Sequence, residues 1–587
     1  MAGSAPDPRR RGWLALVAAL AVYAALLVPT IARQGISWDE QTDLLIARAY
    51  LASPDGWLVG SPSDPSQTRL PMFAVALVYR LLGLSDLFTG RVVSVLVGAL
   101  TIVGAFVLAR RLFDERRAAV ASMLLATSPF FLSFARVAFT ETDVYLACAL
   151  TWFLVVLEGL RAKVTIGRVA AAAVVLGLCL SAKATALALL PAAWFALWKG
   201  GDGGEERAPA PKVAFATLLA AGTTFATVWT AQATPPAAWT SGLRWQLFAA
   251  QFLAWALVLA WAAWDRRAGA HRALLGALLA ALAIATAFVV PPDHLTNPAI
   301  VQGLTTRLDH EVAWRASFML EAASLHVLSI LFKSTPLVGA GILAGLVASA
   351  AQFPSRPELR VPLLAAAGYF AGLEFLPLAQ TYYVVPLLPV FAVLAADQFL
   401  RGMARRRVPA LVLAGAAVAV LVVDLARCYP DYNLDGYQWL GARPLAGRPS
   451  IGYRSVVYTP SDGVQQEFEW LNAHARRGQV VLAYVKPLHI VFMTSPMSPF
   501  RVVDGFQRRV GAPDFIATEI NALLPWNVAD GEDVFRLPYE QAWLERDYTK
   551  VFSVTRAFGI EVAAVWQRRD AASPDAPRAA DAAAGGS

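Results

Sequence analysis

Long apolar runs alternate with short polar loops along most of the chain. A helix needs about 20 apolar residues to cross a bilayer, and a window of about that length marks about thirteen segments here. The pattern predicts an all-α polytopic membrane domain over residues 13–428, after a short segment at residues 1–12. The predicted spans lie near residues 13–31, 91–110, 118–134, 143–160, 169–182, 184–198, 213–231, 244–264, 272–290, 323–349, 361–379, 382–400 and 408–426.

Two parts of this region depart from simple spanning helices. The runs 169–182 and 184–198 are short and are separated only by Lys183, which predicts a broken or re-entrant pair. The long loop at residues 32–90 contains apolar stretches at 44–52 and 71–83 that are too short to cross. We expect both stretches to form helices that lie in the membrane interface.

The pattern changes after residue 428. Alternating stretches at 454–459, 479–485 and 500–506 predict strands, and residues 465–477 predict a helix. The sequence therefore predicts a small α/β domain over residues 429–569. Residues 570–587, which are rich in Ala, Asp, Pro and Gly, are expected to form a disordered tail.

Composition supports the membrane assignment and excludes several other classes. Hydrophobic residues make up 57% of the chain and charged residues 16%, which is outside the range of ordinary soluble domains. The three cysteines are scattered and form no CxxC motif, so neither a structural zinc site nor a disulfide framework is expected. The net charge of +8 comes largely from Arg and Lys in short loops, which a membrane topology explains better than a nucleic-acid partner.

Basic loops set the predicted orientation. Positive residues favour the cytoplasmic side, and with a cytoplasmic N-terminus the loops that face inward are each basic. These loops are residues 110–117, 161–168, 199–212, 265–272, 355–360 and 401–407. An odd number of spans then places GISWDE (35–40), the stretches 135–143 and 291–315, and the domain from residue 429 onward outside the cytoplasmic (inner) membrane.

Several motifs, in their order along the chain, resemble the polyprenyl-phosphate-sugar-dependent glycosyltransferases of the C-type fold. Bacterial protein O-mannosyltransferases and lipid A aminoarabinose transferases are the most similar in pattern. The resemblance covers most of residues 13–426, and the region 232–322 departs from it. The motifs are SWDEQTD (37–43), SQTRLPMF (66–73), SFARVAFTETD (133–143), LSAKATALALLP (180–191), LFKSTPL (331–337) and TYYVVPLLPVFAVLAA (381–396).

The resemblance implies an inverting transfer, in which a base accepts the proton of the acceptor hydroxyl. It maps that base onto Asp39, with Glu40 beside it as an orienting or metal-binding residue. Glu141 is the better match for a second acid near the first, and Asp143 is its neighbour. Without the resemblance, Asp39 and Glu40 could be a solvated flank of the first span, and Glu141 or Asp143 could be a helix cap.

Cations must also meet the departing phosphate. The resemblance places Arg69 at the lipid phosphate, and Arg136 is unusual as an arginine on an outer loop. Lys183 and Lys333 interrupt apolar sequence, where an ionisable residue is a functional hypothesis by default, although a lysine near a span end can also extend to the interface. Tyr382 and Tyr383 open a predicted span, where an aromatic belt is the alternative explanation.

No cofactor is required by this chemistry, and a divalent metal is left open. Glu40, His310 and Glu311 are weak candidate metal ligands, because one histidine among unclustered carboxylates is little evidence. No GxGxxG or GxxxxGK[ST] motif occurs in a strand-to-helix setting, which argues against a nucleotide donor.

The sequence thus predicts an integral-membrane glycosyltransferase that moves a sugar from a polyprenyl phosphate to a hydroxyl on a protein, lipid or glycan. A transporter or flippase of lipid-linked sugars is the first alternative. Such proteins tend to contain internal repeats and midplane charges, whereas this sequence shows no repeat and its charges are predicted to gather at one face. An inactive glycan-binding scaffold on the same fold is the second alternative.

Overall fold

A computed structural model describes the chain in segments. They are residues 8–31, 70–138, 143–162, 166–199, 316–375, 381–405, 410–429, 463–484, 500–504, 512–519, 541–555 and 561–569, with a few residues between 40 and 51 and Gly222. The predicted spans 213–231, 244–264 and 272–290, the strand 454–459 and the tail 570–587 lie outside the described residues, apart from Gly222. The described helices up to residue 428 and the described sheet belong to two separate compact units.

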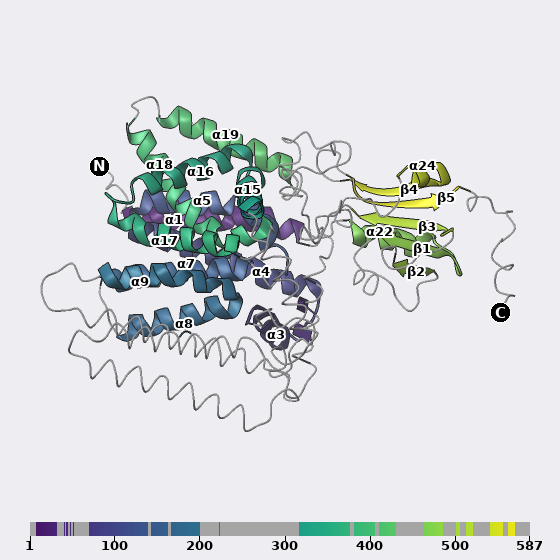
Figure 1. Ribbon diagram of the computed structural model, residues 1–587, viewed down its shortest axis with the longest axis horizontal. Coiled ribbons are helices and arrows are strands. Elements are labelled where there is room, and N and C mark those ends of the chain that lie inside the picture. The colour runs from purple at the N-terminus through teal and green to yellow at the C-terminus, as the bar shows by residue number, and fades with distance from the viewer. Residues whose placement is uncertain are drawn as a thin grey trace, which may run out of the picture. The chain divides into compact units, whose positions relative to one another are not determined.

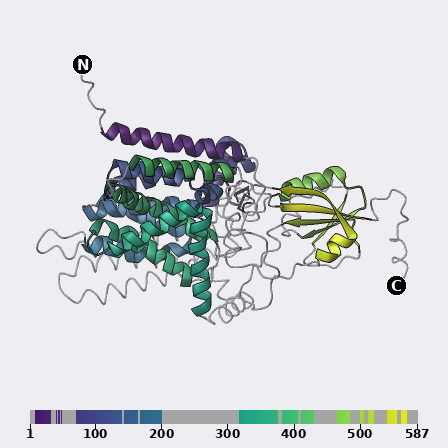
Figure 2. The ribbon, with the colours of Figure 1, turned by 90° about the horizontal axis from the view of Figure 1, so that it is seen from above.

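The first unit is all-helical in its described part (Figure 1). Most of its longer helices lie side by side along a common direction, as Figures 1 and 2 both show. The helices are α1 (Pro8–Leu27), α3 (Leu70–Leu82), α4 (Leu87–Leu112), α5 (Glu115–Ala126), α6 (Pro129–Ala135), α7 (Asp143–Ala162), α8 (Ile166–Ala182), α9 (Leu190–Lys199), α15 (Ala316–Lys333), α16 (Pro336–Ala351), α17 (Pro357–Phe375), α18 (Leu388–Arg405) and α19 (Ala410–Cys428). Short 3-10 helices are η1 (Val28–Thr30), η2 (Ala184–Leu189) and η4 (Thr381–Leu387).

Within the described residues, four helices are long and apolar enough to cross a membrane, or five if one bent pair counts as a single span. The four are Gly12–Thr30, Leu87–Leu112, Val144–Ala162 and Tyr382–Ala404, and each overlaps a predicted span. This supports a polytopic membrane protein. The count of about thirteen stays a prediction, because part of the chain is not described.

Two predicted spans are broken rather than continuous. The run 118–134 consists of α5 and α6, which meet at an angle of 62°. The break follows from local sequence, because Ser128 caps α6 by accepting from the Phe131 N–H and Pro129 begins the new helix. The run 323–349 was wrongly predicted as one span: α15 ends at Lys333 and α16 begins at Pro336.

The pair of short runs around Lys183 is also resolved into separate elements. Helix α8 ends at Ala182, and after Lys183 the chain continues as η2 and then α9. The stretch 71–83, which was predicted to lie in the interface, corresponds to α3, and the described residues of 44–52 are helical as well. Both stretches contribute to one buried cluster, in which Leu44 and Ala47 pack with Met72 and Tyr79 of α3.

Caps fix the starts of α4 and α5, and an ion cluster lies near the start of α5. Asp86 and Asp114 cap α4 and α5 by accepting backbone N–H bonds of 2.7 Å and 2.9 Å. The buried carboxylate of Asp397 in α18 forms ion pairs with three arginines. Arg117 Nε lies 2.6 Å and Arg401 Nε 3.0 Å from Asp397 Oδ1. The third is Arg356, from the turn between α16 and α17. The Asp397 cluster therefore joins α5, α18 and that turn.

The second unit contains a five-stranded mixed sheet in the order β2-β1-β3-β5-β4. Strand β1 runs parallel to β2 and β3, whereas the pairs β3–β5 and β5–β4 are antiparallel. Two of its helices are described. The elements are α22 (Val464–His474), β1 (Val480–Tyr484), β2 (Arg501–Asp504), β3 (Phe515–Glu519), α24 (Gln541–Asp547), β4 (Tyr548–Thr555) and β5 (Glu561–Arg568).

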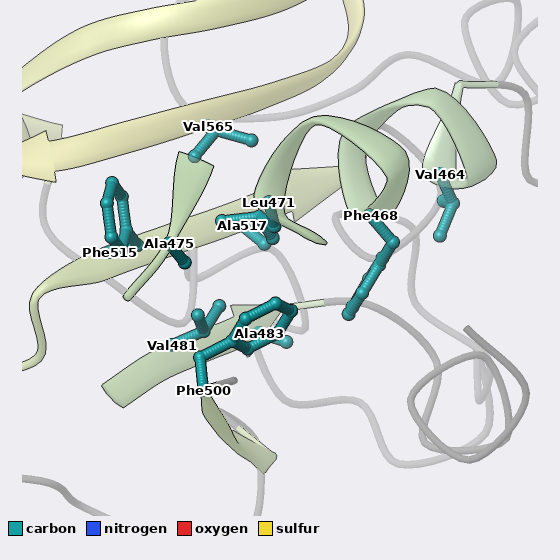
Figure 3. Packing of buried hydrophobic residues seen from close by; sticks show 10 residues of the cluster. All are labelled: Val464, Phe468, Leu471, Ala475, Val481, Ala483, Phe500, Phe515, Ala517 and Val565. Atoms are coloured by element: carbon teal, nitrogen blue, oxygen red, sulfur yellow. The ribbon is translucent and has the colours of Figure 1, made fainter. Parts of the chain in front are cut away.

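Each face of this sheet buries its own apolar residues. Successive side chains of a strand point to opposite faces, so Val481 and Ala483 pack under α22 against Phe468 (Figure 3). Leu482 and Tyr484 belong to a second cluster that also contains Leu544 of α24. The sequence predicted β1, β2 and α22 in these positions, and it did not identify β3, α24, β4 or β5.

Candidate functional site

Glu40 of the SWDEQTD motif is clamped in a buried ion pair with Arg91. Arg91 lies in the first turns of α4, and its Nε and Nη2 donate to the two oxygens of Glu40 at 2.7 Å and 2.8 Å. Arg91 Nη1 also donates to the carbonyl of Ile31 at 2.6 Å, and the Ala138 N–H donates to Glu40 Oε1 at 2.8 Å. The pair is buried, with Glu40 at 0% and Arg91 at 1% exposure. Its hydrogen bonds connect three segments that are distant in sequence.

The hydrogen bonds of Glu40 hold its side chain in one place. The bidentate fork occupies both carboxylate oxygens, which is the strong form of an arginine–carboxylate contact. It also holds the chain immediately beside Asp39. Sequence reasoning missed Arg91, although an arginine at the start of an apolar span was a readable signal.

Several predicted site residues cannot be placed. Asp39, Arg69, Glu141, His310 and Glu311 lie outside the described residues, and Asp143 is described only as the first residue of α7. Their roles therefore remain predictions.

Lys183 and the tyrosine pair, which are about 200 residues apart in sequence, lie together. Lys183 Nζ lies 3.7 Å from the centre of the Tyr383 ring and 5.8 Å from that of Tyr382. The two rings have centroids 4.7 Å apart. The faces of tyrosine rings attract cations and stabilise them where water is scarce. The break after α8 carries the ammonium group, and η4 carries the two rings that it contacts.

An aromatic chain connects this lysine to the second one. The Tyr382 ring lies 6.0 Å from that of Phe134, and the Phe134 ring lies 5.9 Å from that of Phe130, both in α6. Lys333 Nζ lies 5.8 Å from the Phe130 ring centre. Lys333 is buried at the last turn of α15. Short helix α6 therefore lies between two lysines that are far apart in sequence.

Arg136 terminates the same short helix. It is the C-cap residue of α6 and is 2% exposed, so its charge is held inside the protein. The next residue but one is Ala138, whose N–H binds Glu40. Five of the six residues predicted for the donor phosphate thus gather around α6, next to the segment that holds the acidic motif. The sixth, Arg69, is not described.

The described residues form no group of three or more His, Cys, Asp or Glu side chains that could hold a metal ion. Glu40 is engaged by Arg91, and His310 and Glu311 are not described. Metal binding therefore remains an untested expectation.

A family model described as dolichyl-phosphate-mannose-protein mannosyltransferase matches residues 66–229. The matched region contains Arg91, the whole of α6, Arg136 and Lys183. No curated protein shows significant sequence similarity to the chain.

Three solved structures give distant matches. The oligosaccharyltransferase of Archaeoglobus fulgidus, solved with zinc and sulfate, is 16% identical, with a TM-score of 0.46 over 83% of this chain and 62% of that one. AglB from the same organism, with an inhibitory peptide and a dolichol-phosphate, is 16% identical, with a TM-score of 0.46 over 84% and 65%. ArnT from Cupriavidus metallidurans, bound to undecaprenyl phosphate, is 13% identical, with a TM-score of 0.42 over 94% and 98%.

The chain covers less than two thirds of the first two proteins, and similarity at these values decides neither fold nor function. The family match is the finding that bears on identity. It agrees, over residues 66–229, with the resemblance to lipid-phosphate-dependent glycosyltransferases that the sequence motifs indicate.

Proposed function

We propose that this protein transfers a sugar from a polyprenyl phosphate to an acceptor hydroxyl at the outer face of the cytoplasmic membrane. The observation that carries the proposal is that Lys183, Lys333 and Arg136 lie around α6. The Ala138 N–H, just after α6, donates a hydrogen bond to Glu40 of the acidic motif. The family match over residues 66–229 supports the same donor class.

The cations would stabilise the phosphate as it departs. Charge that develops on a leaving group is best stabilised by preorganised positive groups in a site of low dielectric constant. Lys183 lies on the Tyr383 ring, and Lys333 and Arg136 are buried.

The acidic motif would supply the base. In an inverting transfer, the acceptor oxygen attacks the anomeric carbon while a carboxylate takes its proton and the phosphate leaves from the opposite face. Asp39 is assigned this role, and the Glu40–Arg91 pair would hold the backbone that carries it. Glu141 and Asp143 are proposed as further catalytic acids near Asp39, and the described α/β domain is proposed to lie on the outer side.

A transfer assay in detergent tests the proposal. A synthetic polyprenyl-phosphate sugar and candidate acceptors are incubated with the purified protein, and released polyprenyl phosphate is measured by mass spectrometry. The proposal requires release that depends on an acceptor. Movement of the intact donor across vesicle membranes without release would instead support a flippase.

A further inference from the structure

The break between α15 and α16 has a backbone that its residues do not adopt readily. Thr335 has φ +67° and ψ 142°, and it is the only residue other than glycine with a positive φ in the described part of the chain. A β-branched residue in this region costs on the order of 1–3 kcal/mol, and such conformations concentrate at functional sites. The surrounding structure must therefore impose it.

Tight packing of the two helices explains how the conformation is held. A Cβ at Gly339, in the first turn of α16, would collide with the carbonyl oxygens of Leu331 and Ile330 in the last turn of α15. The Gly339 N–H also donates to the Thr335 carbonyl at 2.7 Å. The start of α16 is thus pressed on the end of α15, and the intervening Ser334 and Thr335 are fixed in place.

The two hydroxyls at this break are buried and have no hydrogen-bond partner among the described residues. Ser334 and Thr335 are both 0% exposed, and neither Ser334 Oγ nor Thr335 Oγ1 makes a hydrogen bond within the part of the chain that the structure describes. Thr335 occupies the N-cap position of α16 yet does not cap it. A buried hydroxyl without a partner is costly, so each such group requires an explanation.

The hydroxyls stand at the positive end of a 16-residue helix. The first amides of a helix have no acceptor inside it, and the helix dipole favours an anion there. Pro336 at the first position has no N–H, so the amides of Leu337 and Val338 are the ones that remain. Lys333, which is buried and lies over the Phe130 ring, immediately precedes the two hydroxyls.

We propose that Ser334 Oγ, Thr335 Oγ1 and the N-terminus of α16 bind the phosphate oxygens of the lipid donor, beside the Lys333 ammonium group. The inference rests on the proposed function and adds neutral donors to its cations. Bound phosphate would satisfy both hydroxyls. It would also account for a strained threonine at a position where glycine would relax the backbone.

Binding of undecaprenyl phosphate alone to the full-length protein in detergent tests this site. Thr335→Val keeps the size and branching of threonine but removes the hydroxyl, whereas Thr335→Ser keeps the hydroxyl. A lost hydrogen bond to a charged group should weaken binding by about tenfold to hundredfold in Thr335→Val and in Ser334→Ala. Thr335→Ser should bind nearly as tightly as the parent, and undecaprenol without phosphate should bind the parent more weakly.

Thr151→Val is the matched control. Thr151 is equally buried, but its hydroxyl donates to the Ala147 carbonyl at 2.6 Å within α7, so its loss should affect unfolding temperature without affecting lipid affinity. Competition by inorganic phosphate at least as effective as that by the lipid would assign the site to free phosphate.

The outcomes separate this inference from the function on which it rests. Unchanged affinity in both Thr335→Val and Ser334→Ala, with a parent that binds, would overturn the hydroxyl site alone. Equal affinity of the parent for undecaprenol would overturn phosphate recognition. A parent that binds no undecaprenyl phosphate would overturn the proposed donor and this site together.

Discussion

The buried Glu40–Arg91 pair has a physical role that is independent of chemistry. Removing two charges from water costs more than their attraction returns unless further hydrogen bonds complete the site. Here the Ile31 carbonyl and the Ala138 N–H supply those bonds. The pair therefore specifies how the first loop joins α4 and the segment after α6.

Breaking the pair should destabilise the protein more than replacing it. Arg91→Met leaves a buried carboxylate without its cation, and we expect a loss of roughly 3–5 kcal/mol in unfolding free energy. The double variant Glu40→Leu/Arg91→Met should be less destabilised than Arg91→Met, because no charge remains. Thermal unfolding in detergent measures both. A double variant at least as destabilised as Arg91→Met would contradict the account.

Lys183 offers a second test at the level of single residues. We expect Lys183→Ala to weaken binding of the lipid donor, because a phosphate in a site of low dielectric constant loses a nearby cation. Tyr383→Phe retains a ring face for the ammonium group and should be milder than Tyr383→Leu.

Lys550→Ala is the matched control, because Lys550 also lies over an aromatic ring, with Nζ 4.7 Å from the centre of Trp566. It belongs to the second unit and pairs with Glu561 at 2.9 Å. Donor affinity should be unchanged in this variant. Equal donor affinity in Lys183→Ala and in the parent would remove Lys183 from the phosphate site.

At the scale of elements, the Asp397 cluster fixes the ends of several helices. One carboxylate with no exposed surface receives arginines from α5, from α18 and from the turn before α17. We expect Asp397→Asn to lower the unfolding free energy by roughly 3–5 kcal/mol, because it leaves partly buried arginines without their shared anion.

An exposed pair supplies the comparison for this substitution. Asp547 lies 2.7 Å from Arg546 at the end of α24, and the Arg546 hydrogen bond holds the pKa of that carboxyl below its usual value. Exposed ion pairs contribute little to stability, so Asp547→Asn should change the unfolding temperature only slightly. Similar shifts in the two variants would show that the Asp397 cluster does not organise the helix ends.

Hydropathy predicted where most of the described long helices lie, but it did not predict every break within an apolar run. The span 323–349 was predicted as continuous because its apolar residues run through Lys333, although Thr335 and Pro336 mark a new helix start. Strands β1 and β2 followed from alternation. Strands β3 (FIATE) and β5 (EVAAVWQR) hold consecutive apolar residues rather than an alternation, and a short apolar run does not by itself distinguish a strand from a helix.

At the scale of the whole molecule, the sequence suggested which residues carry chemistry but not which of them meet. Lys183 and Tyr383 are individually conspicuous, yet only the fold places one on the other. The partner of Glu40 was not identified because an ion pair between residues 51 positions apart leaves no local pattern. A single sequence thus indicates which residues could take part in chemistry. Which of them contact one another is seen only in the folded structure.

Membrane orientation gives a prediction that belongs to the whole chain. A reporter fused after residue 431 should be active only when it is exported, and one placed in the basic loop 401–407 should be active only in the cytoplasm. Alkaline phosphatase and green fluorescent protein fusions measure the two compartments. The reverse pattern would place GISWDE on the cytoplasmic side and overturn the proposed site of action.

Turnover of the purified protein and of Asp39→Asn with a polyprenyl-phosphate sugar tests the central claim most directly. Asparagine keeps the size of aspartate but cannot accept the acceptor's proton, and positioned proton transfer typically contributes roughly 10²–10⁴-fold. The account predicts acceptor-dependent release of polyprenyl phosphate by the parent and a loss of that size in Asp39→Asn, with donor binding retained. No release by the parent, or near-normal release by a well-expressed Asp39→Asn, would contradict it.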